Sequence, residues 1–111
     1  MKPIDDILAR LASGTGVDRE LDRDIAKISS VPDMTWIPLY TGSLDECREL
    51  HETLLPGWFW SLDTERAHVW NKSGKRAEGH CDEAGIGICR AWLMAILKAE
   101  AIAKAALKDE G

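Results

Sequence analysis

Histidine and cysteine are the residue types in this chain that are best suited to metal binding. His68, His80, Cys81 and Cys89 are the candidate ligands for a soft metal ion such as zinc, which requires four ligands in a tetrahedron. The chain has no Cys-x-x-Cys pair, and the neighbours His80 and Cys81 would point to opposite faces of a strand. We therefore predict no metal site, and we interpret these residues as buried thiols and surface histidines.

A thiol nucleophile and a phosphate loop are two further sites that the residue types allow. Cys81 lies beside His80 and Asp82, but sequence neighbours rarely form a catalytic pair and no oxyanion turn follows. Residues 14–16, Gly-Thr-Gly, lack the preceding strand and the further glycine of a dinucleotide loop. We interpret them as a break between helices.

His51 and Glu52 are the remaining hint of catalysis. They would begin a His-Glu-x-x-His zinc motif, but position 55 is leucine, so we expect a solvated helix face. No motif holds a paired acid and base. We therefore predict no catalytic residue and no cofactor, and place an enzymatic function behind the two binding hypotheses given below.

Acidic and basic side chains are interleaved along residues 5–27. Such mixing is typical of exposed helix faces with ion pairs four residues apart. The residues are Asp5, Asp6, Asp18, Glu20, Asp22 and Asp24, interleaved with Arg10, Arg19, Arg23 and Lys27.

The charge of the chain excludes some partners. Its net charge of −5 argues against broad binding to a nucleic-acid backbone. The order of elements from residue 43 onward matches double-stranded-RNA-binding domains, but Asp82 and Glu83 precede the last helix, where such domains carry cations. Only Lys72, Lys75 and Arg76 form a basic loop, so we do not expect nucleic acid as a partner.

Cysteine usage and hydropathy predict a cytoplasmic protein. The three cysteines show no pattern of a disulfide framework and are expected to be reduced and mostly buried. Asp5 and Asp6 lie where a signal peptide would need an apolar run, and no stretch approaches the length of a membrane span. We expect no membrane partner.

Helical periodicity predicts three helices in the first half of the chain. The first ends near Ser13, the second covers 18–28, and the third covers 44–54 with Ser43 as its N-cap and Glu46 at the capping-box position. The apolar stripes of the first two are Ile4, Ile7, Leu8 and Leu11, then Val17, Leu21, Ile25 and Ile28. Residues 29–42 are expected to form an ordered, packed loop or a short edge strand.

After residues 56–57 the apolar period changes from that of a helix to that of a strand. Strands are predicted over 58–63, 67–70 and 76–81 as an antiparallel meander, followed by a long helix over about 84–108. The expected fold class is α+β, ordered α-α-α-β-β-β-α, with the sheet packed with helices in an α/β/α sandwich-like arrangement. Residues 1–111 form one domain, with N-terminal helices in 1–29 and the remainder in 43–108.

The five tryptophans predict which face of the sheet is buried. Trp58, Trp60 and Trp92 are expected in the core between sheet and helix, and removal of the Trp60 ring is predicted to cost about 3–5 kcal/mol. The opposite face would carry aromatic side chains that a partner must cover. The predicted interaction surface consists of Phe59, Trp70, Trp36, Arg66, Lys75 and Arg76.

Four segments of the chain carry a combined pattern: Asp18 to Asp22, Pro38 to Asp45, Leu55 to Trp60, and Leu97 to Ala99. In their order and spacing these segments resemble the phage ABA sandwich domain family of small phage and prophage proteins. The chain departs from the family at the last helix, where relatives open with Thr-Pro and this chain has Gly85-Ile86-Gly87-Ile88. The resemblance implies a phage or prophage origin and the cytoplasm of a bacterial host, and it supplies no catalytic residues.

The leading hypothesis is a non-enzymatic phage or prophage accessory protein that binds a host or phage protein. The alternative is a binder of a small, nucleotide-like ligand, with an aromatic pocket at a dimer interface and Arg66, Lys75 or Arg76 as anion contacts. A homodimer is expected because the apolar stripes of the first two helices must be buried, either on their own sheet or against a second copy.

Overall fold

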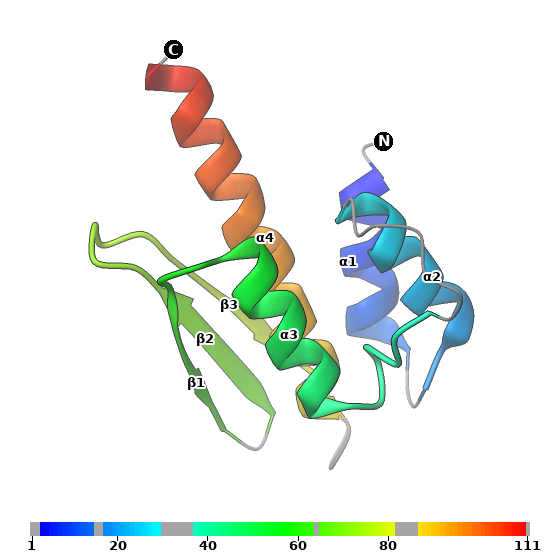
Figure 1. Cartoon of the computed structure of the whole chain (residues 1–111). Helices are drawn as coiled ribbons and strands as arrows, with labels where there is room; N and C mark the ends of the chain where they lie inside the picture. The colour runs from blue at the N-terminus through cyan, green and yellow to red at the C-terminus, as the bar shows by residue number, and fades with distance from the viewer. Residues whose placement is uncertain (1–2, 15–16, 30–36, 64, 82–86, 111) are drawn as a thin grey trace.

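The computed structural model describes residues 3–14, 17–29, 37–63, 65–81 and 87–110. Four helices and one three-stranded sheet follow one another in the order α1, α2, α3, β1, β2, β3, α4 (Figure 1). The predicted α+β class and the predicted order of elements are therefore confirmed. Within the described part of the chain, no helix is long and apolar enough to cross a membrane.

The first helix ends where the sequence predicts, and the second matches its predicted range to within one residue. Helix α1 spans Pro3–Ser13 and helix α2 spans Arg19–Ile28. The Asp18 side chain accepts a hydrogen bond from the Leu21 backbone N–H at 3.0 Å, which satisfies an amide that the helix leaves unpaired. Residues 30–36 of the segment predicted as a loop or edge strand, which include Trp36, lie outside the described residues.

Helix α3 spans Leu44–Leu54 and has the predicted cap. The Ser43 hydroxyl accepts a hydrogen bond from the Glu46 backbone N–H at 3.4 Å. Its C-terminal end is closed by a 2.7 Å bond from the Leu55 N–H to the His51 carbonyl, and Gly57 follows with φ of 84°. This left-handed backbone conformation favours glycine, and it turns the chain from α3 toward the sheet.

The sheet is an antiparallel meander of short strands. Strand β1 spans Phe59–Leu62, β2 spans Arg66–Trp70 and β3 spans Arg76–His80, in the spatial order β1-β2-β3. The register places Phe59 opposite Trp70 and Trp70 opposite Arg76. Because facing residues share one side of a sheet, these three side chains lie on the same face.

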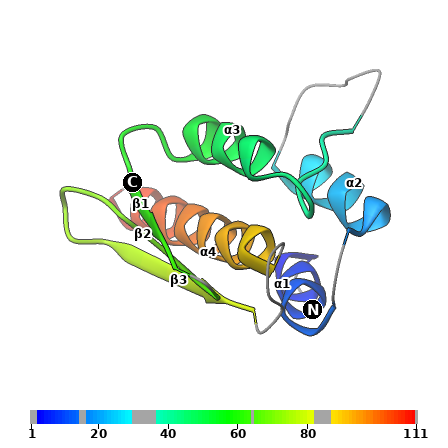
Figure 2. The same cartoon turned by 90° about the horizontal axis from the view of Figure 1, so that it is seen from below.

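Helix α4, Gly87–Glu110, packs across the other face of the sheet, against β2 and β3. The close approach depends on Gly79, because a Cβ atom there would lie 2.0 Å from the Ala91 carbonyl oxygen. The views in Figures 1 and 2 show α3 and α1 beside α4 on this same face, with α2 beyond α1. The described helices thus cover one face of the sheet, whereas the sandwich-like expectation placed the sheet between helical layers.

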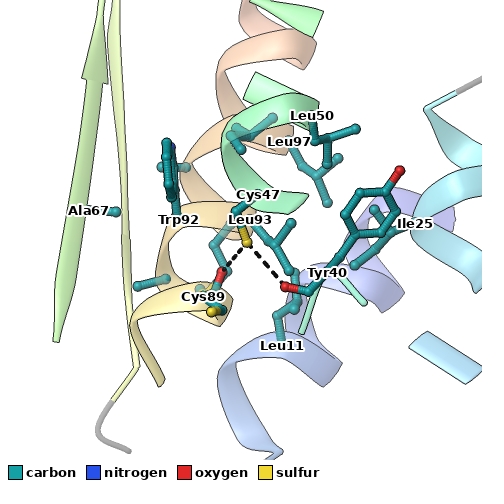
Figure 3. Close-up of a cluster of buried hydrophobic side chains, with 14 of the residues drawn as sticks. Leu11, Ile25, Tyr40, Cys47, Leu50, Ala67, Cys89, Trp92, Leu93 and Leu97 are labelled. Atoms are coloured by element: carbon teal, nitrogen blue, oxygen red, sulfur yellow. Dashed lines mark hydrogen bonds between the residues drawn. The ribbon is translucent and has the colours of Figure 1, made fainter. Parts of the chain in front are cut away.

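The apolar stripes of the first two helices are buried within the chain. Leu11, Leu21 and Ile25 are fully buried, and α1 contacts both α2 and α4. They share one core with Trp92 and Leu93 of α4 (Figure 3). Burial of these stripes therefore requires no second copy, contrary to the reasoning that favoured a homodimer on this ground.

Asp22 corrects the prediction that the carboxylates of the first two helices are all exposed. Its side chain is fully buried, accepts a hydrogen bond from the Thr41 backbone N–H at 2.8 Å and pairs with Arg19 at 2.8 Å. The charge is tolerated inside because both partners satisfy the carboxylate. The pattern of exposed pairs holds elsewhere, as Arg10 contacts Asp6 at 3.3 Å.

Candidate interaction surface

The outer face of the sheet carries four of the six residues predicted for an interaction surface. Phe59, Trp70, Arg66 and Arg76 are all exposed and, by the strand register, all project from the face opposite α4. Phe59 and Trp70 are 45% and 38% exposed, and their rings lie 5.9 Å apart at an interplanar angle of 31°. They form a preassembled aromatic pair.

Lys75 borders this face from the β2–β3 hairpin. The hairpin is closed by the Asn71 side chain, which accepts hydrogen bonds from the backbone N–H groups of Ser73 and Lys75, both at 3.0 Å. Gly74, with φ of 89°, provides the left-handed turn residue. The loop therefore holds Lys75 next to Arg76, while the predicted member Trp36 lies outside the described residues.

Three further residues of the outer face were not among those predicted. Ser61 faces His68, and His68 faces Glu78 across the strands. The His68 Nδ1 atom lies 3.2 Å from a Glu78 carboxylate oxygen. Together with Trp70 and Arg76, these residues line a depression of about 620 Å³. The alternation that placed Phe59 outward also places Ser61 outward, so the pattern could have identified them.

The charges of this face are unevenly distributed. The two acidic side chains near this face each lie beside a histidine. Glu78 lies beside His68, and a carboxylate oxygen of Glu65 lies 3.5 Å from the His80 Nε2 atom. Among the described residues, neither Arg66 nor Arg76 has an ion-pair partner. We define the platform as the set Phe59, Ser61, Arg66, His68, Trp70, Lys75, Arg76 and Glu78. It combines exposed aromatic rings with available cations.

The second aromatic group lies on the helix side of the sheet. The Trp60 ring contacts His51 of α3 and Trp92 of α4, with ring centroids 5.0 and 5.5 Å away. The predicted inward facing of Trp60 is therefore correct, but the side chain is 37% exposed at the sheet edge, whereas Trp92 is 2% exposed. The fully buried ring of this core is Trp92.

His51 contradicts the prediction of a solvated helix face at this position, because it is fully buried. Its Nδ1 atom accepts a hydrogen bond from the Trp92 indole at 3.3 Å, and its Nε2 atom lies 3.1 Å from the Trp58 carbonyl oxygen. An indole N–H only donates, so the proton of the neutral imidazole is on Nε2 and is donated to that carbonyl. Both nitrogens are used, which assigns His51 a structural role.

Stability should therefore depend on pH through His51. Burial lowers the pKa of His51 below its ordinary value of 6.5. The folded state then binds fewer protons than the unfolded state, so stability is fully present above about pH 6.5 and is lost as pH falls toward the lowered value, with a slope of at most about 1.4 kcal/mol per pH unit. Urea unfolding between pH 5 and 7.5 measures this slope.

The control for this measurement is His51→Gln, which does not titrate. We expect a smaller loss of stability on acidification in this variant than in the parent. The two proteins differ only at position 51, so the difference between their slopes is the contribution of His51. Equal slopes would show that His51 does not carry the acid sensitivity.

All three cysteines are free and buried, as predicted: Cys47, Cys81 and Cys89. The Cys47 Sγ atom donates to the Tyr40 carbonyl at 3.1 Å (Figure 3). Hydrogen bonding with Cys89 and burial raise the pKa of the Cys47 thiol, so it remains protonated and is a poor nucleophile. Among the described residues, no three His, Cys, Asp or Glu side chains gather in a way that could hold a metal ion.

Fold and surface together define a small α+β protein in which the described helices cover one face of a three-stranded sheet, and no described helix covers its aromatic, cationic face. In comparisons with known proteins, no family model matches this chain, and no curated protein or solved structure is significantly similar to it.

Proposed function

We propose that this chain is a non-enzymatic accessory protein of phage or prophage origin, acting in the bacterial cytoplasm, that binds another protein through the platform. The observation that carries the proposal is the exposed ring pair of Phe59 and Trp70 on a sheet face that no described helix covers. Exposed aromatic residues surrounded by polar groups are typical of protein-binding sites. The support for a phage origin is the resemblance of four sequence segments alone, because no family model matches the chain.

The charges of the platform select the chemistry of the partner. Arg76 faces Trp70 across the strands, Arg66 lies on the same face at the other end of β2, and Lys72 and Lys75 are exposed in the adjoining hairpin. An acidic peptide segment with an apolar or aromatic side chain matches this arrangement, because the ring pair can cover the apolar group while the guanidinium groups bind carboxylates. The chain as a whole has a net charge of −5, so the cations of this face differ in sign from the protein's net charge.

A peptide-display selection tests this proposal. A random library is selected on the parent protein and counter-selected on the double variant Phe59→Ala/Trp70→Ala. We expect enrichment of peptides that combine Asp or Glu with an apolar residue, and at least tenfold weaker binding to the double variant, since two interface aromatics together contribute more than about 1.4 kcal/mol. Arg76→Glu should also weaken binding relative to the parent, and more so at low salt, where charge interactions are less screened.

The matched control is Leu44→Ala on α3, which truncates a side chain that is 45% exposed, as Phe59 is, but lies away from the platform. This variant should bind the selected peptides as the parent does. Peptides that bind the double variant equally well, or a selection without acidic and apolar enrichment, would contradict the proposed function.

The depression beside Trp70 and Arg76 favours a second candidate function, the binding of a small nucleotide-like ligand. Its volume of about 620 Å³ is in the range of small-molecule sites, and it offers an aromatic ring, a guanidinium group and His68. A thermal-shift panel of mononucleotides separates the two candidates, because a ligand at a hundred times its dissociation constant stabilises a protein by about 2.7 kcal/mol.

A further inference from the structure

Strand β1 forms an edge of the described sheet and lacks the usual protection of such an edge. Its four residues, Phe59-Trp60-Ser61-Leu62, include no charge and no proline. Phe59 and Trp60 are 45% and 37% exposed. Proteins normally protect exposed edge strands with charges, proline or a covering element, because an open edge pairs with other chains.

The opposite edge of the same sheet is protected. Strand β3 carries Arg76, Glu78 and His80, and the Lys98 ammonium group of α4 donates a hydrogen bond to the Glu78 carbonyl at 3.1 Å. A backbone acceptor of this edge is therefore already used by the chain itself. The contrast between the two edges indicates that β1 is the edge available for pairing.

The backbone of β1 is oriented for strand addition. The Asp63 N–H donates to the Arg66 carbonyl at 2.8 Å, which makes positions 63 and 66 a hydrogen-bonded pair of the antiparallel ladder. Hydrogen-bonded and non-bonded pairs alternate along such a ladder. The N–H and C=O groups of Trp60 and Leu62 consequently point away from β2, toward the outer edge.

We propose that β1 pairs antiparallel with β1 of a second copy of this chain, about a two-fold axis at Ser61. Trp60 of each copy then lies opposite Leu62 of the other, and the outward N–H and C=O groups form four backbone hydrogen bonds. The two meanders become one six-stranded sheet. A two-fold contact of this kind is closed, so it ends at the dimer.

The residues of this edge fit a second copy of themselves. On the helix side, the exposed part of Trp60 would pack on the apolar Leu62 of the other copy. On the outer side, the small Ser61 side chain faces its own equivalent at the axis without a clash. Arg48 lies over the Trp60 ring at 5.9 Å and bonds to Glu52 at 3.3 Å, so the flank carries one charge of each sign. Two-fold symmetry can place each charge near its opposite.

The dimer does not require the proposed function, because it is formed by β1 and not by partner binding at the platform. It would, however, place two platforms in one assembly. Because the sheet is continuous across the axis, both platforms lie on the same side of one surface. A partner with two acidic apolar segments could bind both at once.

Sedimentation velocity at about 1–100 µM protein tests the proposal, a range suited to micromolar association. The parent should reach twice the chain mass of 12.3 kDa. Ser61→Lys and Ser61→Glu should each be monomeric, because they place like charges directly opposite each other at the axis. Ser61 is exposed, so neither change should affect folding. An equimolar mixture of the two variants should recover the dimer mass.

Two controls complete the experiment. Ser73→Lys, in the exposed hairpin away from the axis, should remain dimeric, and so should Phe59→Ala/Trp70→Ala, whose defect is in partner binding. A monomeric parent, dimeric single Ser61 variants or a monomeric mixture would overturn pairing at β1 and leave the proposed function untouched. Loss of the dimer in the Phe59→Ala/Trp70→Ala variant would instead assign the contact to the platform.

Discussion

Gly79→Ala should destabilise the protein by about 3 kcal/mol or more, at the upper end of overpacking costs. The added Cβ would lie 2.0 Å from the Ala91 carbonyl oxygen and 2.7 Å from the Met94 Cβ atom, so helix α4 must move off the sheet. The first obstacle is backbone, which a change of side-chain rotamer does not relieve. Urea unfolding, monitored by tryptophan fluorescence, measures the loss.

Glu78→Ala is the control for this substitution. Glu78 is the preceding residue of the same strand, but its side chain is 70% exposed on the opposite face. The cost should remain within about 0.5 kcal/mol. A Gly79→Ala variant as stable as Glu78→Ala would mean that α4 does not pack this closely against β3.

Trp92→Ala should cost about 3–5 kcal/mol, the range for removal of a buried aromatic ring. Trp92 is 2% exposed, and its loss also removes the donor to the Nδ1 atom of His51. Trp92→Phe keeps a six-membered ring but removes the five-membered ring together with its N–H donor, so it should cost less than Trp92→Ala. Thermal and urea unfolding of the two variants measure this difference.

The comparison with Trp60→Ala decides which tryptophan dominates the core. The sequence predicts about 3–5 kcal/mol for this change, but the 37% exposure of Trp60 lowers the expected cost to about 2–3 kcal/mol, because a smaller apolar area is removed from water on folding. If Trp60→Ala proved as damaging as Trp92→Ala, the edge position of Trp60 would be wrong.

Local patterns predict the elements of this fold well because each pattern depends on near neighbours. Ser43 and Asp18 cap helices through amides three residues ahead, and the alternation after residue 58 reports the two faces of β1 directly. The same alternation places Phe59 and Trp70 together on the outer face. These are relations that a sequence displays.

Burial by distant partners is what the sequence did not reveal. His51 lies on a helix of mostly polar residues, and its two hydrogen-bond partners come from Trp58 and from Trp92, which is 41 residues away. In the sequence, Asp22 is one of several helix carboxylates, and only the fold brings the Thr41 backbone N–H to it. Whether the outer face of the sheet is covered likewise depended on where α1 and α2 pack, and α1 packs against α4 while α2 packs against α1.

The buried Arg90 of α4 donates hydrogen bonds to the carbonyls of Arg10 and Leu11, at the end of α1, across sequence separations of 80 and 79 residues. Ribosomes release the N-terminus first, at about 5–20 residues per second. Residues 10 and 11 therefore precede their partner by roughly 4–16 s of synthesis, from these separations and that rate. During that interval the stripes of α1 and α2 have no α4 to cover them, and the nascent chain exposes these apolar helix faces before it can fold.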